Sequence, residues 1–167
     1  VKAEFAKGLS GRWGAGLPSG GDGQLLFLQS AVNKLDPDCG RAAIIENGSP
    51  LFTGGTSSGE SQIRRWLLEK DLLEAIIALP TDLFYNTGIP IYAFIFNMKK
   101  SEARKGKIQL IDASNFSRRL AKGLGFKRNE LTEEHINEIV RLYVEFDNDK
   151  NSKNVFSVIV GGVVALQ

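Results

Sequence analysis

The sequence has few of the residues that bind metals or form disulfides. Its 167 residues include one cysteine, Cys39, and one histidine, His135. A single cysteine excludes a disulfide within the chain, and the two residues together are too few for a zinc site built from cysteine and histidine. The sequence also has no phosphate-binding Gly-Lys-Ser/Thr loop, no nucleophile elbow and no histidine dyad. These absences exclude zinc enzymes and the common hydrolase mechanisms.

Long hydrophobic runs are missing too. A membrane-spanning helix needs about 18 consecutive apolar residues, whereas the apolar tail at residues 155–166 is shorter and is interrupted by Gly161 and Gly162. The chain does not begin with a secretory signal peptide. With 43% hydrophobic residues, we expect one globular domain in the cytoplasm, without membrane contact.

Positive charge is concentrated in one part of the chain. The whole sequence carries a net charge of +2, but residues 99–128 contain ten basic and two acidic residues, so this stretch carries +8 and the remainder −6. A basic stretch of this kind is typical of a nucleic-acid partner, or of a solvated loop that keeps the protein soluble.

Hydrophobic periodicity predicts part of an α/β sheet. Residues 1–23 are rich in glycine and read as a loop-rich remnant. The following elements are expected, in order: a helix at 24–35, a buried strand at 41–45, a Gly/Ser/Thr loop at 53–59, a helix at 60–70, strands at 72–79 and 89–96, an edge strand at 107–111, an irregular basic stretch at 115–130, and an amphipathic helix that begins near Thr132. The connection at residues 80–88 is too short for a helical crossover, so the strand at 89–96 should run antiparallel to the one before it.

Two loops at strand ends are the best candidates for a binding site, because open α/β sheets bind ligands beyond the carboxyl ends of their strands. The first covers residues 46–52 and contains Asn47. The second covers residues 79–90 and contains Phe84 and Tyr85. Each has an aromatic residue flanked by polar, glycine and proline residues, which suits the stacking of a planar ligand.

The same loops carry a resemblance to the modification subunits of type I restriction systems. Residues 40–52, Gly-Arg-Ala-Ala-Ile-Ile-Glu-Asn-Gly-Ser-Pro-Leu-Phe, resemble one block of that family, and residues 73–90, Leu-Glu-Ala-Ile-Ile-Ala-Leu-Pro-Thr-Asp-Leu-Phe-Tyr-Asn-Thr-Gly-Ile-Pro, resemble the next. Residues 107–114 and 127–131 are similar as well. The resemblance is colinear over residues 24–147, which makes it far more specific than a lone motif.

The resemblance implies both a fold and an activity. The fold would be a partial, Rossmann-like sheet of an S-adenosylmethionine-dependent methyltransferase, with a reversed β-hairpin, flanking helices and a C-terminal helix. Residues 24–115 would be the C-terminal half of that domain, 116–150 a basic loop with an amphipathic helix, and 151–167 an atypical apolar tail. The family transfers a methyl group from S-adenosylmethionine to N6 of adenine in duplex DNA. A specificity subunit and a restriction subunit would be its partners.

The resemblance also implies roles for individual residues. A target base must leave the helical stack to be methylated, and in related enzymes an aromatic residue stacks on it. Phe84 matches that position and Tyr85 is the next candidate, while Asn47, Asn86 and Thr87 would line the pocket. The candidates for DNA contact are Lys99, Lys100, Arg118, Arg119 and Lys122. The alternatives are that Phe84 packs into the core beneath its loop, and that the three polar residues only shape their turns.

The central catalytic group of the family is not in this sequence. Its Asn-Pro-Pro-Phe/Tyr loop holds the adenine amino group, but the five prolines here stand at 18, 37, 50, 80 and 90, so no Pro-Pro pair exists. The Gly-containing turn that holds the cofactor is absent too. We therefore expect the isolated chain to be inactive, with doubtful binding of S-adenosylmethionine. Two alternatives are a non-catalytic DNA- or partner-binding module that uses the basic 99–128 stretch, and a scaffold that binds neither ligand.

Overall fold

The structure, a computed structural model, describes residues 3, 6–7, 12–160 and 163–166, and it describes side chains as far as residue 156. Part of the predicted loop-rich segment 1–23 therefore lies outside the described residues. The described elements follow this order: α2 (Gln24–Val32), β1 (Arg41–Asn47), α3 (Ser49–Phe52), α4 (Gly59–Glu69), β2 (Leu73–Leu79), β3 (Ile91–Asn97), β4 (Lys107–Asp112), β5 (Arg118–Leu124), β6 (Lys127–Glu130), α5 (Glu133–Glu145), β7 (Ser152–Val160) and β8 (Val163–Leu166).

The main sheet is mixed, with its strands in the order β1-β3-β2-β4-β7-β8. β1, β2 and β4 run in one direction, and β3 lies reversed between β1 and β2. Ile44 of β1 and Ile76 of β2 both pair with Phe94 of β3. The short connection between β2 and β3 forces this antiparallel pairing, because a parallel neighbour would need a crossover of a dozen or more residues. The predicted reversed hairpin is confirmed.

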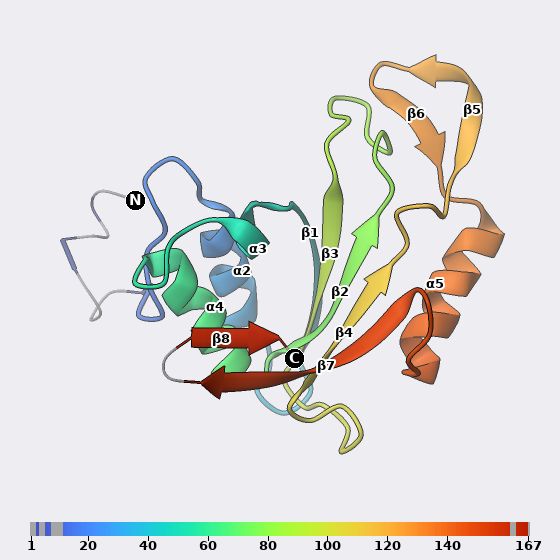
Figure 1. Ribbon diagram of the computed structural model, residues 1–167. Helices are drawn as coiled ribbons and strands as arrows, with labels where there is room; N and C mark the ends of the chain where they lie inside the picture. Colours follow the sequence, from blue (N-terminus) through green and yellow to red (C-terminus); the bar gives the residue numbers. More distant parts are fainter. Residues whose placement is uncertain (1–2, 4–5, 8–11, 161–162, 167) are drawn as a thin grey trace.

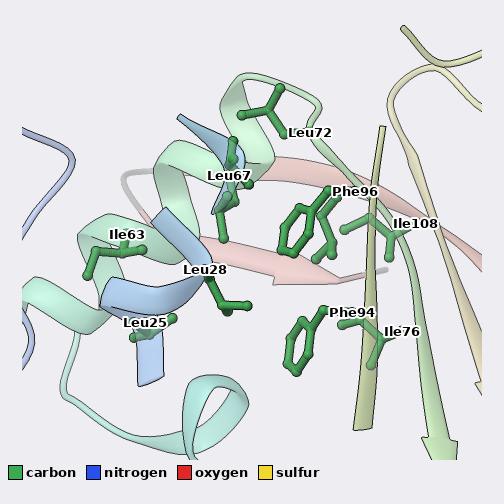
Figure 2. Packing of buried hydrophobic residues seen from close by; sticks show 11 residues of the cluster. Leu25, Leu28, Ile63, Leu67, Leu72, Ile76, Phe94, Phe96 and Ile108 are labelled. Atoms are coloured by element: carbon green, nitrogen blue, oxygen red, sulfur yellow. The ribbon is translucent and has the colours of Figure 1, made fainter. Parts of the chain in front are cut away.

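Helices cover both faces of the sheet. α2, α3 and α4 lie on one face and α5 on the other (Figure 1). The larger core fills the first face, where Leu28 of α2, Ile63 of α4 and Phe96 of β3 are completely buried. Figure 2 shows these side chains meeting between the helices and the sheet. Burying a side chain of this size stabilises the fold by about 1.5–3 kcal/mol, so this core fixes the strands whose ends carry the candidate site.

A polar seam fastens α5 to the opposite face. The buried Glu74 carboxylate of β2 accepts hydrogen bonds from Arg41 Nη2 (3.1 Å) and from the Tyr143 hydroxyl (2.5 Å). The buried Gln109 of β4 donates from Nε2 to the carbonyl of Leu142 (2.7 Å). Removing one member would leave a buried polar group less well satisfied, which destabilises the fold by more than an exposed hydrogen bond would. The seam therefore fixes the position of α5 on the sheet.

Two expectations about the second half of the chain are wrong. β4 is not an edge strand, because β7 pairs with it, with Ile108 opposite Val155 and Ile111 opposite Ser152. The basic stretch at residues 115–130 is not irregular, because it folds into the two-stranded β5–β6 hairpin. The apolar tail continues the sheet through β7 and β8, where its β-branched residues suit strand pairing.

Candidate nucleic-acid interface

The two loops predicted to form a site lie at the same end of the sheet, beyond the carboxyl ends of β1 and β2. β1 ends at Asn47 and β2 ends at Leu79, and both residues pair with Ile91, the first residue of β3. The β5–β6 hairpin extends from the same end of the molecule (Figure 1). The sheet therefore brings together the two loops and the basic hairpin at the carboxyl ends of β1, β2 and β4, where open α/β sheets bind ligands.

The loop at residues 80–90 presents its aromatic residues outward. Phe84 forms an isolated bridge with Thr87, which closes a tight turn with Tyr85 at its tip. The side chains are 41% exposed at Phe84 and 63% exposed at Tyr85. Asp82 adopts a φ of +58°, and Gly88 lies so close to it that an added Cβ would sit 2.4 Å from Asp82 Oδ1. This geometry holds two partly exposed aromatic rings on a constrained turn.

The predicted pocket-lining residues lie at the same edge and partly shape their own turns. Asn47 Oδ1 accepts a hydrogen bond from the Ser49 backbone N–H (2.8 Å), and Thr87 Oγ1 accepts one from Ile89 N–H (3.4 Å). Asn86 is exposed beside Tyr85. Asn47 and Thr87 therefore help to shape their own turns, as the alternative proposed, whereas Asn86 is exposed at the tip of the loop.

The half-buried carboxyl group of Glu46 lies next to the first of these loops, near the end of β1. Glu46 follows Ile45 near the end of β1, and burial together with the nearby Asp22 carboxylate raises the pKa of Glu46 to about 7. Asp22 itself is held by the Ser49 hydroxyl and the Gln24 backbone N–H, and these hydrogen bonds lower the pKa of Asp22. The edge of the sheet thus holds one carboxylate that ionises readily and one that resists ionisation.

The hairpin is clamped onto the aromatic loop. The Phe126 backbone N–H donates to the carbonyl of Tyr85 (3.0 Å), and the N–H groups of Arg128 and Asn129 donate to the carbonyl of Asp82 (2.9 and 3.1 Å). The Lys127 ammonium lies 5.2 Å from the centre of the Tyr85 ring, within cation–π range. The tip of the hairpin and the tip of the loop therefore form one surface.

The basic residues of the 99–128 stretch do not form one surface. Lys99 and Lys100 lie at the opposite edge of the sheet, where β3 ends. Lys100 is buried, with its Nζ 2.5 Å from Asp71 Oδ1 and 2.8 Å from the carbonyl of Lys107. Burial lowers the pKa of Lys100, although the Asp71 carboxylate opposes the change. Lys100 therefore stabilises the fold and is not available to DNA. The basic residues expected to form one surface lie at opposite ends of the sheet.

The hairpin carries the remaining predicted contacts. Arg119 and Lys122 are exposed. Arg118 is also exposed but pairs with Glu130, with its Nη2 2.7 Å from Oε1. Sequence reasoning missed Lys127 and Arg128 as site residues, together with the apolar tip. The Gly125-Phe126 pair, with basic segments on both sides, was the available signal for a hairpin with a two-residue loop.

An apolar cavity of about 660 Å³ lies between the helical layer and the sheet. Its lining includes Leu28, Ile76 and Phe94 of the core, and neither Phe84 nor Tyr85 belongs to it.

Among the residues that the structure describes, no group of three or more histidine, cysteine, aspartate or glutamate side chains could hold a metal ion. None of the described helices is long and apolar enough to cross a membrane. The candidate site is therefore the aromatic and basic edge of the sheet.

The fold is a mixed α/β sheet with one reversed strand, and aromatic and basic groups lie beyond the carboxyl ends of its parallel strands. These features place the protein among the α/β proteins that bind ligands at the carboxyl ends of their strands. The family described as N-6 DNA Methylase matches residues 5–161. The chain belongs to this family.

Individual relatives agree with the family. The chain is 41% identical over 115 residues to the type I restriction enzyme MjaVII methylase subunit of Methanocaldococcus jannaschii, covering 65% of this chain and 18% of the relative. It is 32% identical over 123 residues to the type I restriction enzyme EcoKI methylase subunit of Escherichia coli, covering 73% and 22%. The chain therefore spans about a fifth of the length of these relatives.

Solved structures of the family share the fold. The type I restriction-modification methyltransferase subunit from Streptococcus thermophilus superposes with a TM-score of 0.69 at 28% identity, covering 80% of this chain and 26% of that one. The EcoKI M protein gives a TM-score of 0.56 at 31% identity, covering 73% and 25%. These similarities establish a partial methyltransferase fold with a mixed sheet.

Proposed function

We propose that this chain is part of a DNA adenine-N6 methyltransferase, the modification subunit of a type I restriction system. The observation that carries the proposal is the turn bearing Phe84 and Tyr85 at the carboxyl edge of the sheet, clamped by a basic hairpin. A base extruded from duplex DNA is held by stacking and by contacts to its polar edge. The exposed rings would supply the stacking, and the basic hairpin would contact the phosphates.

Residue roles follow from this arrangement. Phe84 stacks on the target adenine, and Tyr85 supports it or contacts the neighbouring nucleotide. Polar groups beside them face the edge of the base: Asn86 directly, with Asn47 and Thr87 forming the pocket wall. Arg119 and Lys122 contact phosphates, with Arg118 as a weaker contributor because Glu130 neutralises it. We leave Lys99 and Lys100 out of the interface because they lie at the other edge.

The longer subunit would bind S-adenosylmethionine and act with a specificity subunit, a restriction subunit and DNA. In that protein the cofactor supplies the methyl group. The described edge supplies base capture and phosphate contacts, and the residues that hold the adenine amino group come from elsewhere, because this chain has no Asn-Pro-Pro sequence. The isolated chain is therefore proposed to be inactive.

A second candidate is a DNA- or partner-binding module without catalysis. The missing Asn-Pro-Pro sequence favours it, and the clamped hairpin provides a basic surface independent of any cofactor. In this case binding depends on the hairpin charges and not on Phe84. Replacing Arg118 and Arg119 with glutamine would abolish salt-sensitive binding, while Phe84→Ala would leave it intact.

The test is Phe84→Ala in the longer methyltransferase, with 2-aminopurine at the target adenine. We expect the fluorescence rise that reports base extrusion to fall by about fivefold or more, since stacking contributes about 1–3 kcal/mol per base, while S-adenosylmethionine affinity stays within twofold. Phe27→Ala, which removes an exposed ring on α2, is the matched control. Equal losses of base capture and cofactor affinity would mean that Phe84 is a core residue and that the assigned role is wrong.

A further inference from the structure

The tip of the β5–β6 hairpin carries two exposed apolar side chains. Leu124 is 50% exposed and Phe126 is 58% exposed, and they flank Gly125 in the two-residue turn, where Leu124 pairs with Lys127. The exposed charged side chains of the hairpin are all basic: Arg118, Arg119, Lys122 and Arg128. Neither apolar residue belongs to the cores on the two faces of the sheet. A basic strand pair with an apolar tip suits a surface that meets both phosphates and bases.

The tip is held rigidly next to the base-stacking loop. Gly125 has a φ of +65°, in the left-handed region that glycine adopts without steric cost. A Cβ added at Gly125 would lie 2.6 Å from the Tyr85 carbonyl oxygen, so no other residue fits there without displacement. The Phe126 N–H bonds to the same carbonyl. The chain therefore fixes Leu124 and Phe126 at a defined position relative to Phe84 and Tyr85.

We propose that Leu124 and Phe126 form a wedge that enters the DNA duplex at the target base pair. Some DNA-bending proteins insert phenylalanine or leucine between base steps, and the additional protein–DNA contacts offset the cost of unstacking. Extrusion of the adenine leaves a gap in the stack, and Phe126 fills it while Phe84 holds the extruded base. This inference rests on the proposed function and assigns to the hairpin the step that precedes base capture.

Basic side chains on both sides of the tip would direct it toward the bases of the duplex. Arg119 and Lys122 lie on β5 and Arg128 lies on β6, so positive charge precedes and follows the apolar turn along the hairpin. Phosphates line the groove on both sides of the bases, and cations that bind them position a protein without reading sequence. The wedge is therefore proposed as a positioning element, and sequence recognition is left to other parts of the protein.

The test uses Phe126→Ala, Phe126→Leu and Phe126→Trp in the longer methyltransferase. With 2-aminopurine at the target, Phe126→Ala should reduce the extruded fraction by roughly fivefold or more at saturating protein, the lower range for one stacked aromatic ring. Phe126→Leu should retain most of it, because an apolar wedge remains. The tryptophan in Phe126→Trp should be quenched when the site-containing duplex binds, as it stacks between bases. Cofactor affinity should not change.

Phe156 provides the matched control, since its ring is 57% exposed on β7. Phe156→Ala should leave extrusion unchanged, and Phe156→Trp should not be quenched by DNA. An unchanged extruded fraction in Phe126→Ala, together with no quenching in Phe126→Trp, would overturn the wedge. If that result occurs while Phe84→Ala still loses base capture, only the wedge fails. If the unsubstituted protein shows no extrusion at all, the proposed function and the wedge both fail.

Discussion

Glu46 shows how a single residue at the candidate site responds to its surroundings. In water a glutamate has a pKa near 4.5, whereas here burial and the Asp22 carboxylate raise the pKa of Glu46 to about 7. The folded state therefore favours the protonated form. The stability that this preference contributes is fully present below pH 4.5, declines as the pH rises from 4.5 to 7, and is lost above pH 7.

Glu46→Gln should remove this pH dependence. At pH 8 the free energy of unfolding of the variant should be about 1 kcal/mol higher than that of the unsubstituted chain. This figure is reduced to allow for solvent screening of a half-exposed carboxyl group. Near pH 4 the two should be equal. Urea unfolding followed by circular dichroism at both pH values measures the difference. Glu69→Gln, which removes a partly exposed carboxylate that pairs with Arg65 on α4, is the control for the loss of a surface charge and should change the free energy of unfolding at pH 8 by less than about 0.5 kcal/mol. A Glu46→Gln variant without gain at pH 8 would contradict the assignment.

At the scale of elements, α5 depends on polar contacts as much as on apolar ones. Only Ile139 and Leu142 of this helix are buried hydrophobic residues, whereas Ile136, Val140 and Val144 are exposed. Thr132 caps the start of the helix: its hydroxyl accepts a hydrogen bond from the His135 N–H in a capping box. The seam around Glu74 then fixes its second half to the sheet.

Tyr143→Phe tests the seam. The hydroxyl lies 2.5 Å from the Glu74 carboxylate, and burial followed by this hydrogen bond raises the pKa of Tyr143 to about 12. Loss of a hydrogen bond to a charged group should lower the free energy of unfolding by about 1.5–3 kcal/mol, measured by urea denaturation at neutral pH. Tyr85→Phe, at an exposed tip, should change it by less than about 0.5 kcal/mol. A Tyr143→Phe variant as stable as the unsubstituted chain would mean that the seam is too open to solvent to matter.

At the scale of the whole molecule, β1 is one of the two outer strands of the main sheet. β1 pairs with β3 on one side and forms the end of the sheet among the described residues. On the α5 face of this strand Ile45 is half-exposed, although a strand between two neighbours would bury it. The described sheet thus resembles one part of a larger domain, in agreement with coverage of about a fifth of its relatives.

The isolated chain should therefore bind no S-adenosylmethionine and transfer no methyl group to DNA. Cofactor binding should be lost because the Gly-containing turn that holds S-adenosylmethionine in the family is absent, and methyl transfer because no Asn-Pro-Pro loop supplies the acceptors that direct the adenine nitrogen toward the methyl group. Calorimetric titration of the cofactor and transfer of labelled methyl to duplex DNA are the measurements. Saturable binding would show that the cofactor site is more complete than the sequence indicates, and methyl transfer would refute the proposed inactivity.

The sequence by itself determined most of the helices and strands before residue 115, and the family. Helical spacing predicted a helix at residues 60–70, and α4 spans Gly59–Glu69 with Ile63 and Leu67 buried. The short connection at residues 80–88 predicted the reversed strand, because chain length alone excludes a crossover. The colinear resemblance predicted the family, which the match over residues 5–161 confirms. Periodicity, turn chemistry and connection length act over short distances along the chain, so a reader of the sequence can recover them.

Only the tertiary structure decided which distant segments share an edge. Lys100 and Lys122 belong to the same basic stretch, yet the first pairs with Asp71 in the interior and the second lies on an exposed hairpin. The contact between Phe126 and Tyr85 joins segments that are far apart in the sequence. Such contacts depend on strand order and on the direction in which each strand leaves the sheet. These are set by packing of the whole core, and no local pattern of residues specifies them.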